Sequence, residues 1–346
     1  MSDKENQHYV PKFYLRKFSF NNNAKEIGIF NIKKEFFFQK APLKSQAKKS
    51  FYYGKKGNEE LLSRYENLFA TIINIILGVR NVPLTGSIEH LYLLLFVTST
   101  IFRNPIYHNS AIESFQKIAN ILNERGTAGS DILEKIRLTL PQSQNLSFNE
   151  FIKGALFCRD LNIKIIQNNT SLPFITSDNP IIKYNQFLEE KKHSGGITGF
   201  GLMGLQIFIP IDPRTMLVFY DKSVYKVGTR SQTEIITNNY HDIYQMNLLQ
   251  FINCDNTTFF NQEIDKAELS GIYENSKKFA KANISNVKEY PTSDPKKSLL
   301  SMNKTDCKIK LDLSFIKKLR QASVKKIDDN LQIRKWPETL HFKYRM

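Results

Sequence analysis

The residues that follow the start of the chain could support phosphodiester chemistry. His8 lies between Gln7 and Tyr9, and Lys12 and Arg16 follow it. A histidine side chain titrates near neutral pH, so His8 could act as a general base or as a metal ligand. Lys12 and Arg16 could hold a substrate phosphate. The alternative is a structural histidine that bonds the backbone where a domain begins.

A second group of polar residues lies in the middle of the chain. Ser177, Asp178 and Asn179 follow a short apolar stretch and precede Pro180. A turn after a strand often places polar side chains at the mouth of a cleft. Asp178 could therefore act as a base or bind Mg²⁺ together with Glu66, while Ser177 and Asn179 contact a phosphate. The alternative is an Asx turn at Asp178 and a solvated Glu66.

A third candidate is the stretch Arg103-Asn104-Pro105-Ile106-Tyr107-His108, which resembles the active motif of the HEPN ribonucleases. The resemblance implies a helical site that cleaves RNA without a metal ion. Arg103 would then stabilise the charge on the phosphorane, and His108 would transfer a proton during attack by the 2′-OH. Pro105 departs from that motif. The alternative is a structural or phosphate-binding Arg103 at a helix end.

The net charge favours a phosphate-bearing partner. The 346 residues contain 49 Lys and Arg against 33 Asp and Glu, a formal charge of +16. Residues 1–56 carry +9 and residues 291–346 carry +8, so the middle is close to neutral. If both ends lie on one face beside His8 and Asp178, that face would attract nucleic acid. The alternative is a lysine excess that comes from an AT-rich genome.

Several classes of protein are excluded. The cysteines Cys158, Cys254 and Cys307 are too few and too widely spaced for a disulfide scaffold or a zinc finger. Residues 1–7 lack the apolar segment of a signal peptide, and the apolar run 91–102 is too short to span a bilayer. We therefore expect a cytoplasmic protein that does not bind membranes.

The pattern of apolar residues predicts the elements that position these candidates. Short strands over 27–32 and 35–39 are expected to pair as a hairpin. Helices are expected over 59–79, 87–102, 110–125, 131–138 and 147–159. Strands are expected over 162–167, 174–177, 205–211 and 215–221, with a glycine-rich, substrate-gating loop over 191–204.

These elements predict an α+β fold with an N-terminal β-hairpin, a helical middle, an antiparallel sheet and a basic C-terminal extension. A single domain is expected over residues 1–284, with a helical part over about 57–160 and a β-rich part over about 161–260. Residues 285–346 are expected to form a basic linker and extension, with a basic helix over 314–326.

Two signatures resemble those of a widespread microbial domain family of unknown function. The first, over residues 7–18, is Gln7-His8-Tyr9-Val10-Pro11 followed by Phe13, Tyr14, Leu15, Arg16 and Phe18. The second is Phe174-Ile175-Thr176-Ser177-Asp178-Asn179-Pro180. Glu66, Phe102-Arg103 with Pro105, and Asn247 with Gln250 are weaker matches, and the resemblance covers about residues 7–260. Some members look like components of phage-defence or toxin loci, which favours an enzyme that damages nucleic acid.

Together these observations predict a nuclease that cleaves RNA, in preference to DNA, or single-stranded nucleic acid. It would act as a toxin or phage-defence effector, with a protein partner in a defence or toxin–antitoxin complex. The alternative is a non-catalytic protein that binds nucleic acid or a partner. The candidate catalytic residues are His8, Arg103, His108 and Asp178; the candidate substrate contacts are Lys12, Arg16, Ser177, Asn179 and Asn247; the candidate Mg²⁺ ligands are Asp178 and Glu66.

Overall fold

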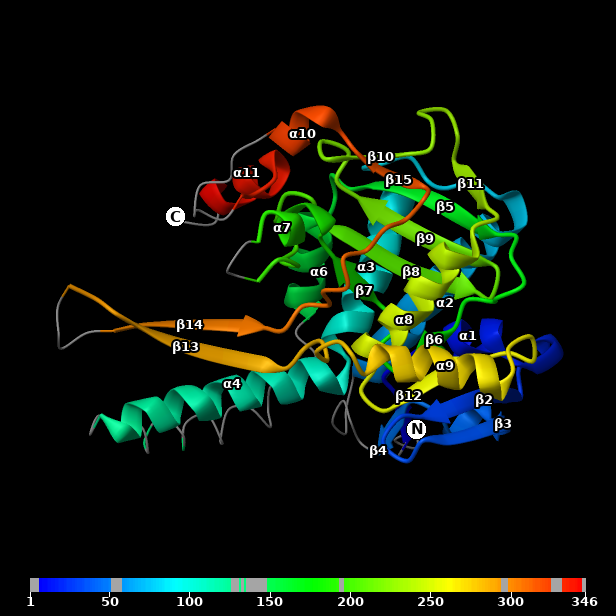
Figure 1. Cartoon of the computed structure of the whole chain (residues 1–346), viewed down its shortest axis with the longest axis horizontal. Coiled ribbons are helices and arrows are strands. Elements are labelled where there is room, and N and C mark those ends of the chain that lie inside the picture. Colours follow the sequence, from blue (N-terminus) through cyan, green and yellow to red (C-terminus); the bar gives the residue numbers. More distant parts are fainter. Residues whose placement is uncertain are drawn as a thin grey trace.

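A computed structural model describes most of the chain, and it has a five-stranded sheet at its centre (Figure 1). The described residues are 6–50, 58–125, 131, 134, 148–192, 196–293, 298–324 and 332–343. Most of the helix expected over 131–138 lies outside them. The helices are α1 (Lys12–Leu15), α2 (Asn58–Val79), α3 (Ile88–Phe102), α4 (Pro105–Glu124), α6 (Phe148–Phe157), α7 (Gln186–Glu190), α8 (Tyr240–Asn253), α9 (Lys266–Ser276), α10 (Arg320–Val324) and α11 (Lys335–Lys343).

The central sheet has the strand order β11-β5-β9-β8-β7. Neighbouring strands are antiparallel except for β11 and β5, which are parallel. The predicted α+β class is therefore confirmed, with one parallel pair at an edge of the sheet. The strands are β5 (Asn162–Asn168), β7 (Ile182–Tyr184), β8 (Gln206–Asp212), β9 (Thr215–Tyr220) and β11 (Glu234–Thr237).

Both faces of this sheet are covered, and the side chains of its inner strands are divided between two cores. Successive residues of a strand point to opposite faces. Phe208 accordingly packs into one core, whereas its neighbours Ile207 and Ile209 pack into the other. All seven residues of β8 except the last are buried, which explains its nearly continuous apolar sequence.

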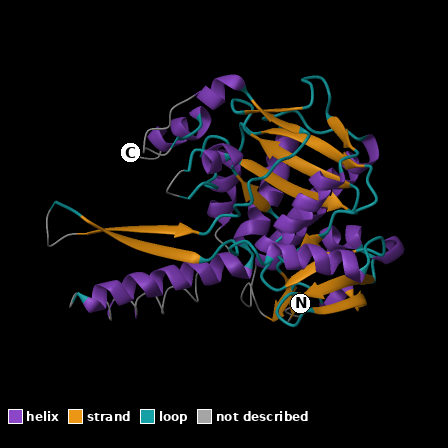
Figure 2. Cartoon of the chain, viewed as in Figure 1, coloured by secondary structure: helices purple, strands orange, loops and turns teal. Residues whose placement is uncertain are grey.

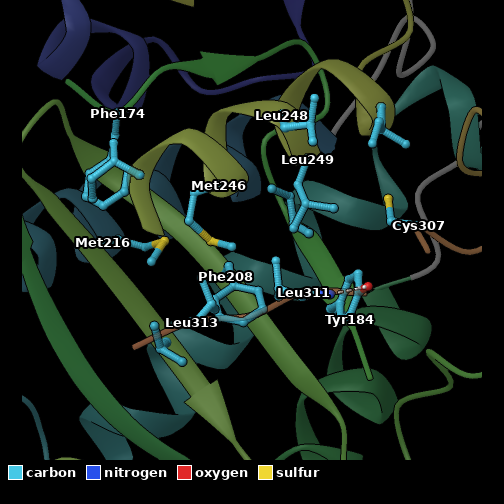
Figure 3. Close-up of a cluster of buried hydrophobic side chains, with 14 of the residues drawn as sticks. Phe174, Tyr184, Phe208, Met216, Met246, Leu248, Leu249, Cys307, Leu311 and Leu313 are labelled. Atoms are coloured by element: carbon cyan, nitrogen blue, oxygen red, sulfur yellow. Dashed lines mark hydrogen bonds between the residues drawn. The ribbon is translucent and has the colours of Figure 1, made fainter. Parts of the chain in front are cut away.

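Helix α8 covers the first face of the sheet. Figure 3 shows Met246 and Leu249 of this helix above Phe208 and Met216 of the sheet. Residues 307–316 extend this core, because Cys307, Leu311, Leu313, Phe315 and Ile316 are buried in it. The C-terminal part of the chain thus contributes to the main hydrophobic core.

Helices α2, α3 and α6 cover the opposite face, together with the N-terminal segment. Phe96 of α3 is at the centre of this second core, where its ring contacts those of Phe13, Tyr14 and Phe69 at centroid distances of 5.7, 6.1 and 5.6 Å. The first helical residues of the chain are therefore packed against the helical middle.

A second sheet joins the N-terminal hairpin to distant parts of the chain. Its strand order is β3-β2-β12-β6, with β2 (Glu26–Asn31), β3 (Phe36–Pro42), β6 (Thr176–Ser177) and β12 (Thr257–Phe260). The predicted hairpin is confirmed, since β2 and β3 are antiparallel neighbours. Outside this sheet, β1 (Asn6–His8) pairs with β4 (Lys48–Ser50) as an antiparallel pair, which joins the two ends of the N-terminal segment 6–50.

The helix boundaries follow the sequence closely, with one exception. The predicted helices over 59–79 and 87–102 are α2 and α3. The third helix was expected from residue 110, but α4 begins at Pro105. Asn104 caps it, because its Oδ1 accepts a hydrogen bond from the backbone N–H of Ile106 at 3.0 Å.

The prediction of a linker over 285–310 is wrong. Strands β13 (Ser285–Pro291) and β14 (Ser298–Lys304) form an antiparallel pair that projects beside α4 (Figure 2). The basic helix expected over 314–326 is also wrong in its first part. There, β15 (Ile316–Lys318) pairs with β10 (Tyr225–Val227), and the short helix α10 follows. The domain boundary at residue 284 stays a prediction.

The prediction that the two basic ends share one face is also wrong. In Figure 1 the N-terminal strands lie at the bottom of the molecule, whereas α10 and α11 lie at the upper left. The positive charges of α10 and α11 therefore lie away from His8. Among the described residues, no helix is long and apolar enough to cross a membrane.

The packing of Phe96 gives a test of the second core. Truncation of this buried ring in Phe96→Ala leaves a cavity among three aromatic side chains and should lower the free energy of unfolding by about 4 kcal/mol. Urea unfolding followed by circular dichroism measures the change.

Leu84→Ala is the matched control. Leu84 is 82% exposed, so its truncation should change the free energy of unfolding by less than about 0.5 kcal/mol. Equal effects of the two substitutions would contradict the placement of Phe96.

Candidate functional site

The segment that contains Asp178 is held by a row of amide side chains on α8. Asn247 accepts a hydrogen bond from the backbone N–H of Ile175 at 3.0 Å and donates to the carbonyl oxygen of Pro173 at 2.8 Å. One turn later, Gln250 donates to the carbonyl oxygen of Pro180 at 3.1 Å. Asn253 donates to the carbonyl oxygen of Ile181 at 3.0 Å. We call these three side chains the α8 amide row.

Ser177 and Asn179 are bound to the same helix. The Ser177 hydroxyl donates to Oε1 of Gln250 at 2.7 Å, and the Asn179 amide donates to the carbonyl oxygen of Asn253 at 3.0 Å. Both side chains are buried, as is that of Asn247. The prediction that Ser177, Asn179 and Asn247 contact substrate is corrected on these grounds: their polar atoms satisfy buried backbone groups instead.

Asp178 is engaged by the turn that precedes β12. One carboxylate oxygen accepts the backbone N–H of Asp255 at 2.9 Å, and the other accepts those of Asn256 and Thr257 at 2.8 and 2.9 Å. Burial raises the pKa of Asp178 to about 6, while these three N–H groups act in the opposite direction. The predicted roles of Asp178 as catalytic base and Mg²⁺ ligand are therefore replaced by a structural one.

Glu66, the other expected Mg²⁺ ligand, is paired with Arg103. Their closest atoms, Oε1 and Nη1, are 2.6 Å apart. Arg103 is 2% exposed and ends α3, whereas Glu66 on α2 is 29% exposed. Within the described ranges, no group of three or more His, Cys, Asp or Glu side chains could hold a metal ion. Glu66 and Asp178 are thus both engaged by other groups of the chain, and the Mg²⁺ site itself stays a prediction.

The motif of Arg103 and His108 is divided between two helices. Arg103 follows the last residue of α3, Asn104 is the N-cap of α4, and His108 lies on α4. Burial and the charge of Lys49 lower the pKa of the half-buried His108. Because the guanidinium of Arg103 is buried against Glu66, it cannot reach a substrate phosphate directly, which corrects its predicted catalytic role.

Direct hydrogen bonds join the three candidate segments. The Asn104 amide donates to the backbone oxygen of Asp178 at 2.7 Å. The Tyr14 hydroxyl donates to the carbonyl oxygen of Pro210 at 2.7 Å and lies 2.6 Å from the hydroxyl of Thr176. The sequence separates these segments by 70 residues or more, yet the fold brings them into contact around one buried polar centre.

His8 lies at the edge of this centre among positive charges. It pairs with Lys48 in the β1–β4 ladder, and its Nε2 is 3.2 Å from the carbonyl oxygen of Lys44. Burial, together with the charges of Lys12, Lys48 and Arg103, lowers the pKa of His8 to about 4, while the hydrogen bond to the Lys44 backbone acts in the opposite direction. At neutral pH the imidazole is uncharged and able to accept a proton.

The positive charges continue from His8 along α1. Lys12 and Arg16 are both exposed and are one helical turn apart. We call His8, Lys12, Arg16 and Lys48 the basic strip. Among the described residues, the side chain of Arg16 has no hydrogen-bond or ion-pair partner, so its guanidinium is available to an anion.

Arg16 also lines a cavity of about 700 Å³, which we call the basic pocket. Its other cations are engaged by neighbours: Lys17 donates to Asn74 at 2.7 Å, and Arg80 donates to Gln167 at 2.6 Å. Arg80 has a positive φ of 53°, a conformation that costs energy for a residue other than glycine. The charged residues that line the pocket are Arg16, Lys17, Arg80, Asp212, Arg214 and Glu263.

The sequence did not indicate the basic pocket, because its cations come from separate segments. Arg16 and Lys17 follow α1, Arg80 follows α2, and Arg214 lies in the turn between β8 and β9. The available signal was weak: Arg16 and Lys17 are adjacent in the N-terminal signature. The pairing of Glu66 with Arg103 was missed for the same reason, although both residues were singled out.

The fold and the site define an α+β protein with a buried polar centre and a basic strip at its surface. Residues 6–263 match the model of a family described as protein of unknown function (DUF4238), and the chain belongs to this family. No curated protein and no solved structure matches the chain. The basic strip, the basic pocket and the α8 amide row all lie inside the matched region.

The three N–H groups around Asp178 lead to a stability prediction. Asp178→Ala leaves the buried N–H groups of Asp255, Asn256 and Thr257 without their acceptor. The free energy of unfolding should therefore fall by about 3 kcal/mol or more, which denaturant unfolding would measure.

Asp255→Ala is a matched control, because the neighbouring Asp255 side chain is exposed. Its substitution should change the free energy of unfolding by less than about 0.5 kcal/mol. A loss of similar size in both variants would contradict the structural role of Asp178.

Proposed function

We propose that this protein binds single-stranded RNA along the basic strip and cleaves it with His8 as the proton acceptor. One observation carries the proposal: the half-buried His8 lies near three cations, Lys12, Lys48 and Arg103, at the start of the family domain. A neutral imidazole beside positive charges is suited to take a proton while a phosphate is held next to it.

The proposed reaction needs a 2′-OH, which makes RNA the substrate and not DNA. His8 takes the proton of the 2′-OH, and the 2′-oxygen forms a bond to the adjacent phosphorus. The bond from phosphorus to the 5′-oxygen then breaks, and the leaving oxygen receives a proton from protonated His8. The products are a 2′,3′-cyclic phosphate and a free 5′-OH, so no water or metal ion is consumed.

Lys12 and Arg16 are proposed to hold the RNA backbone. Both are exposed, and their spacing of one helical turn allows each to reach a different phosphate oxygen or neighbouring phosphates. The basic pocket beyond Arg16 offers room for the next nucleotide. Phosphate contacts of this kind supply affinity without base specificity.

Arg103 is proposed as a positioning residue that acts through His8. Its buried charge disfavours protonation of the imidazole, and its ion pair with Glu66 fixes the guanidinium. Arg103 therefore keeps His8 in the basic form without contact to substrate.

An RNA-cleaving enzyme of this kind would harm the cell that makes it, which supports a toxin or phage-defence effector with a restraining protein partner.

The first test is cleavage of a labelled single-stranded RNA. We expect cleavage that persists in the presence of EDTA, and a loss of at least about 100-fold in His8→Ala, because general-base catalysis typically contributes 10²–10⁴-fold. The matching all-deoxy strand should bind without cleavage.

His241→Ala is the control, since His241 is an exposed histidine on α8. Its cleavage rate should equal that of the unchanged protein. If RNA binds the protein with an affinity that Arg16→Ala weakens, but no preparation cleaves it, the non-catalytic binding protein becomes the correct description. If neither binding nor cleavage occurs, both descriptions are wrong.

The second test is the pH dependence of cleavage. Only unprotonated His8 can act as the base, so kcat/KM should fall as the pH decreases through the pKa of His8. Because that pKa is lowered to about 4, the acidic limb should lie near pH 4 and not near the value of 6.5 for an ordinary histidine. Rates measured from pH 3.5 to 8 define the limb.

Lys12→Met separates this effect from a general acid denaturation. Removal of the charge of Lys12 should raise the pKa of His8, because that charge contributes to lowering it. The acidic limb should then move to higher pH, and an NMR titration of the His8 ring should move with it. A limb that stays in place while the ring titration shifts would exclude His8 as the base.

A further inference from the structure

A second cavity lies between the glycine-rich loop and the C-terminal part of the chain. Its volume is about 560 Å³, within the usual range for small-molecule sites. Residues outside the family match contribute to it, namely Lys304, Asp306 and Ile333. The lining residues that matter below are Phe102, Lys183, Gly199, Phe200, Lys304 and Asp306.

Three lysines, Lys153, Lys183 and Lys304, line this cavity together with two acidic residues, Glu150 and Asp306. The two lysines that matter below are Lys183 and Lys304. Lys183 donates to the carbonyl oxygen of Thr198 at 3.0 Å, and its Nζ is 4.8 Å from the centre of the Phe200 ring. Lys304 has its Nζ 4.0 Å from the centre of the Tyr107 ring. Within the part of the chain that the structure describes, the Lys304 ammonium has no hydrogen bond or ion pair.

Burial disfavours the charge on both lysines. It lowers the pKa of Lys304 to about 7, and the charge of Lys183 contributes to this shift. Burial also lowers the pKa of Lys183, although the charge of Asp306 acts in the opposite direction. Two buried amines that repel each other are a costly arrangement unless an anion binds between them.

The acidic groups of the cavity are engaged elsewhere. Asp306 accepts hydrogen bonds from the backbone N–H of Ile197 at 2.9 Å and from the Thr198 hydroxyl at 2.5 Å. At the rim, Glu150 lies 3.3 Å from the ammonium of Lys153. Asp306 therefore fixes the loop and favours the charge on Lys183, whereas Glu150 pairs with Lys153. Lys304 has no acidic partner within the described residues.

Aromatic side chains line the cavity beside the lysines. Phe102 and Phe200 both line it, with ring centroids 5.9 Å apart, and Phe200 is the ring that Lys183 contacts. Gly199 and Gly201 of the loop also line it. Cationic groups beside aromatic rings suit a ligand that has phosphate at one end and a planar ring at the other.

The C-terminal segment holds the loop in this shape. The Arg334 guanidinium donates to the carbonyl oxygens of Phe200 and Leu202, both at 2.8 Å, and to the carboxylate of Asp160 at 2.9 Å. The backbone N–H of Arg334 donates to the carbonyl oxygen of Gly201 at 2.8 Å. The predicted mobile gate is thus a loop fixed by its neighbours over the described residues 196–204.

We propose that this cavity binds a mononucleotide, with the phosphate between Lys183 and Lys304 and the base beside Phe102 and Phe200. Lysine ammonium groups bind phosphate, and bases stack on aromatic side chains. The inference does not depend on RNA cleavage, because it concerns a different cavity that residues outside the family match complete.

Calorimetric titration of the full chain with AMP, ATP, inorganic phosphate and adenosine tests the proposal. At least one of the two nucleotides should bind at one site, at least tenfold more tightly than both phosphate and adenosine. Trp336 gives a second readout. It is the single tryptophan of the chain, it follows Ile333 of the cavity by three residues, and its Nε1 donates to the carbonyl oxygen of Leu156 at 2.8 Å.

The lysine variants decide where the nucleotide binds. Lys183→Met and Lys304→Met should each weaken nucleotide binding at least tenfold without a lower melting temperature, because each removes a buried charge. Lys308→Met, at an exposed lysine nearby in sequence, should bind as the unchanged chain does.

The proposal is overturned if neither nucleotide binds, or if phosphate or adenosine alone binds as tightly as AMP and ATP. It is also overturned if both lysine variants keep full affinity, or if Arg16→Ala and not the lysine variants loses it, since the nucleotide would then occupy the basic pocket.

Discussion

The rest of the structure depends on the hydrogen bonds between the α8 amide row and residues 173–181. That segment crosses the interior with few ladder partners of its own, and a buried backbone group without a partner is costly. Amides spaced one turn apart along α8 satisfy these groups. With the segment fixed, the Asp178 carboxylate can bind the turn before β12. The Thr176 hydroxyl can then bond that of Tyr14, and the backbone oxygen of Asp178 can accept a hydrogen bond from Asn104.

This arrangement separates two kinds of polar residue that look alike in a sequence. Asp178, Ser177 and Asn247 use their polar side chains to hydrogen-bond backbone groups inside the protein. The half-buried His8 and the exposed Lys12 and Arg16 lie at the edge of the same centre, where the charges of the two basic residues face solvent. The N-terminal signature therefore contains both kinds, since Tyr14 anchors it and the basic residues remain accessible.

The sequence predicted elements better than contacts. The three- and four-residue spacing of apolar residues located α2 to within one residue of its start, and the strand hairpin of β2 and β3 was also found. The β13–β14 pair was missed because β13 is mostly exposed and lacks apolar alternation, so only its backbone reveals it. The partners of Asp178 are backbone N–H groups, which every residue but proline has, and no residue pattern could indicate them.

The clamp of Arg334 on the glycine-rich loop has a consequence for the order of folding. Gly201 and Arg334 are far apart in the chain, and residues 332–334 are synthesised after almost everything they hold in place. Contacts between distant segments form slowly, because a long loop must close first. During synthesis the sheet and its helices can therefore assemble before the loop is locked, and the cavity with Lys183 and Lys304 takes its final shape at the last step.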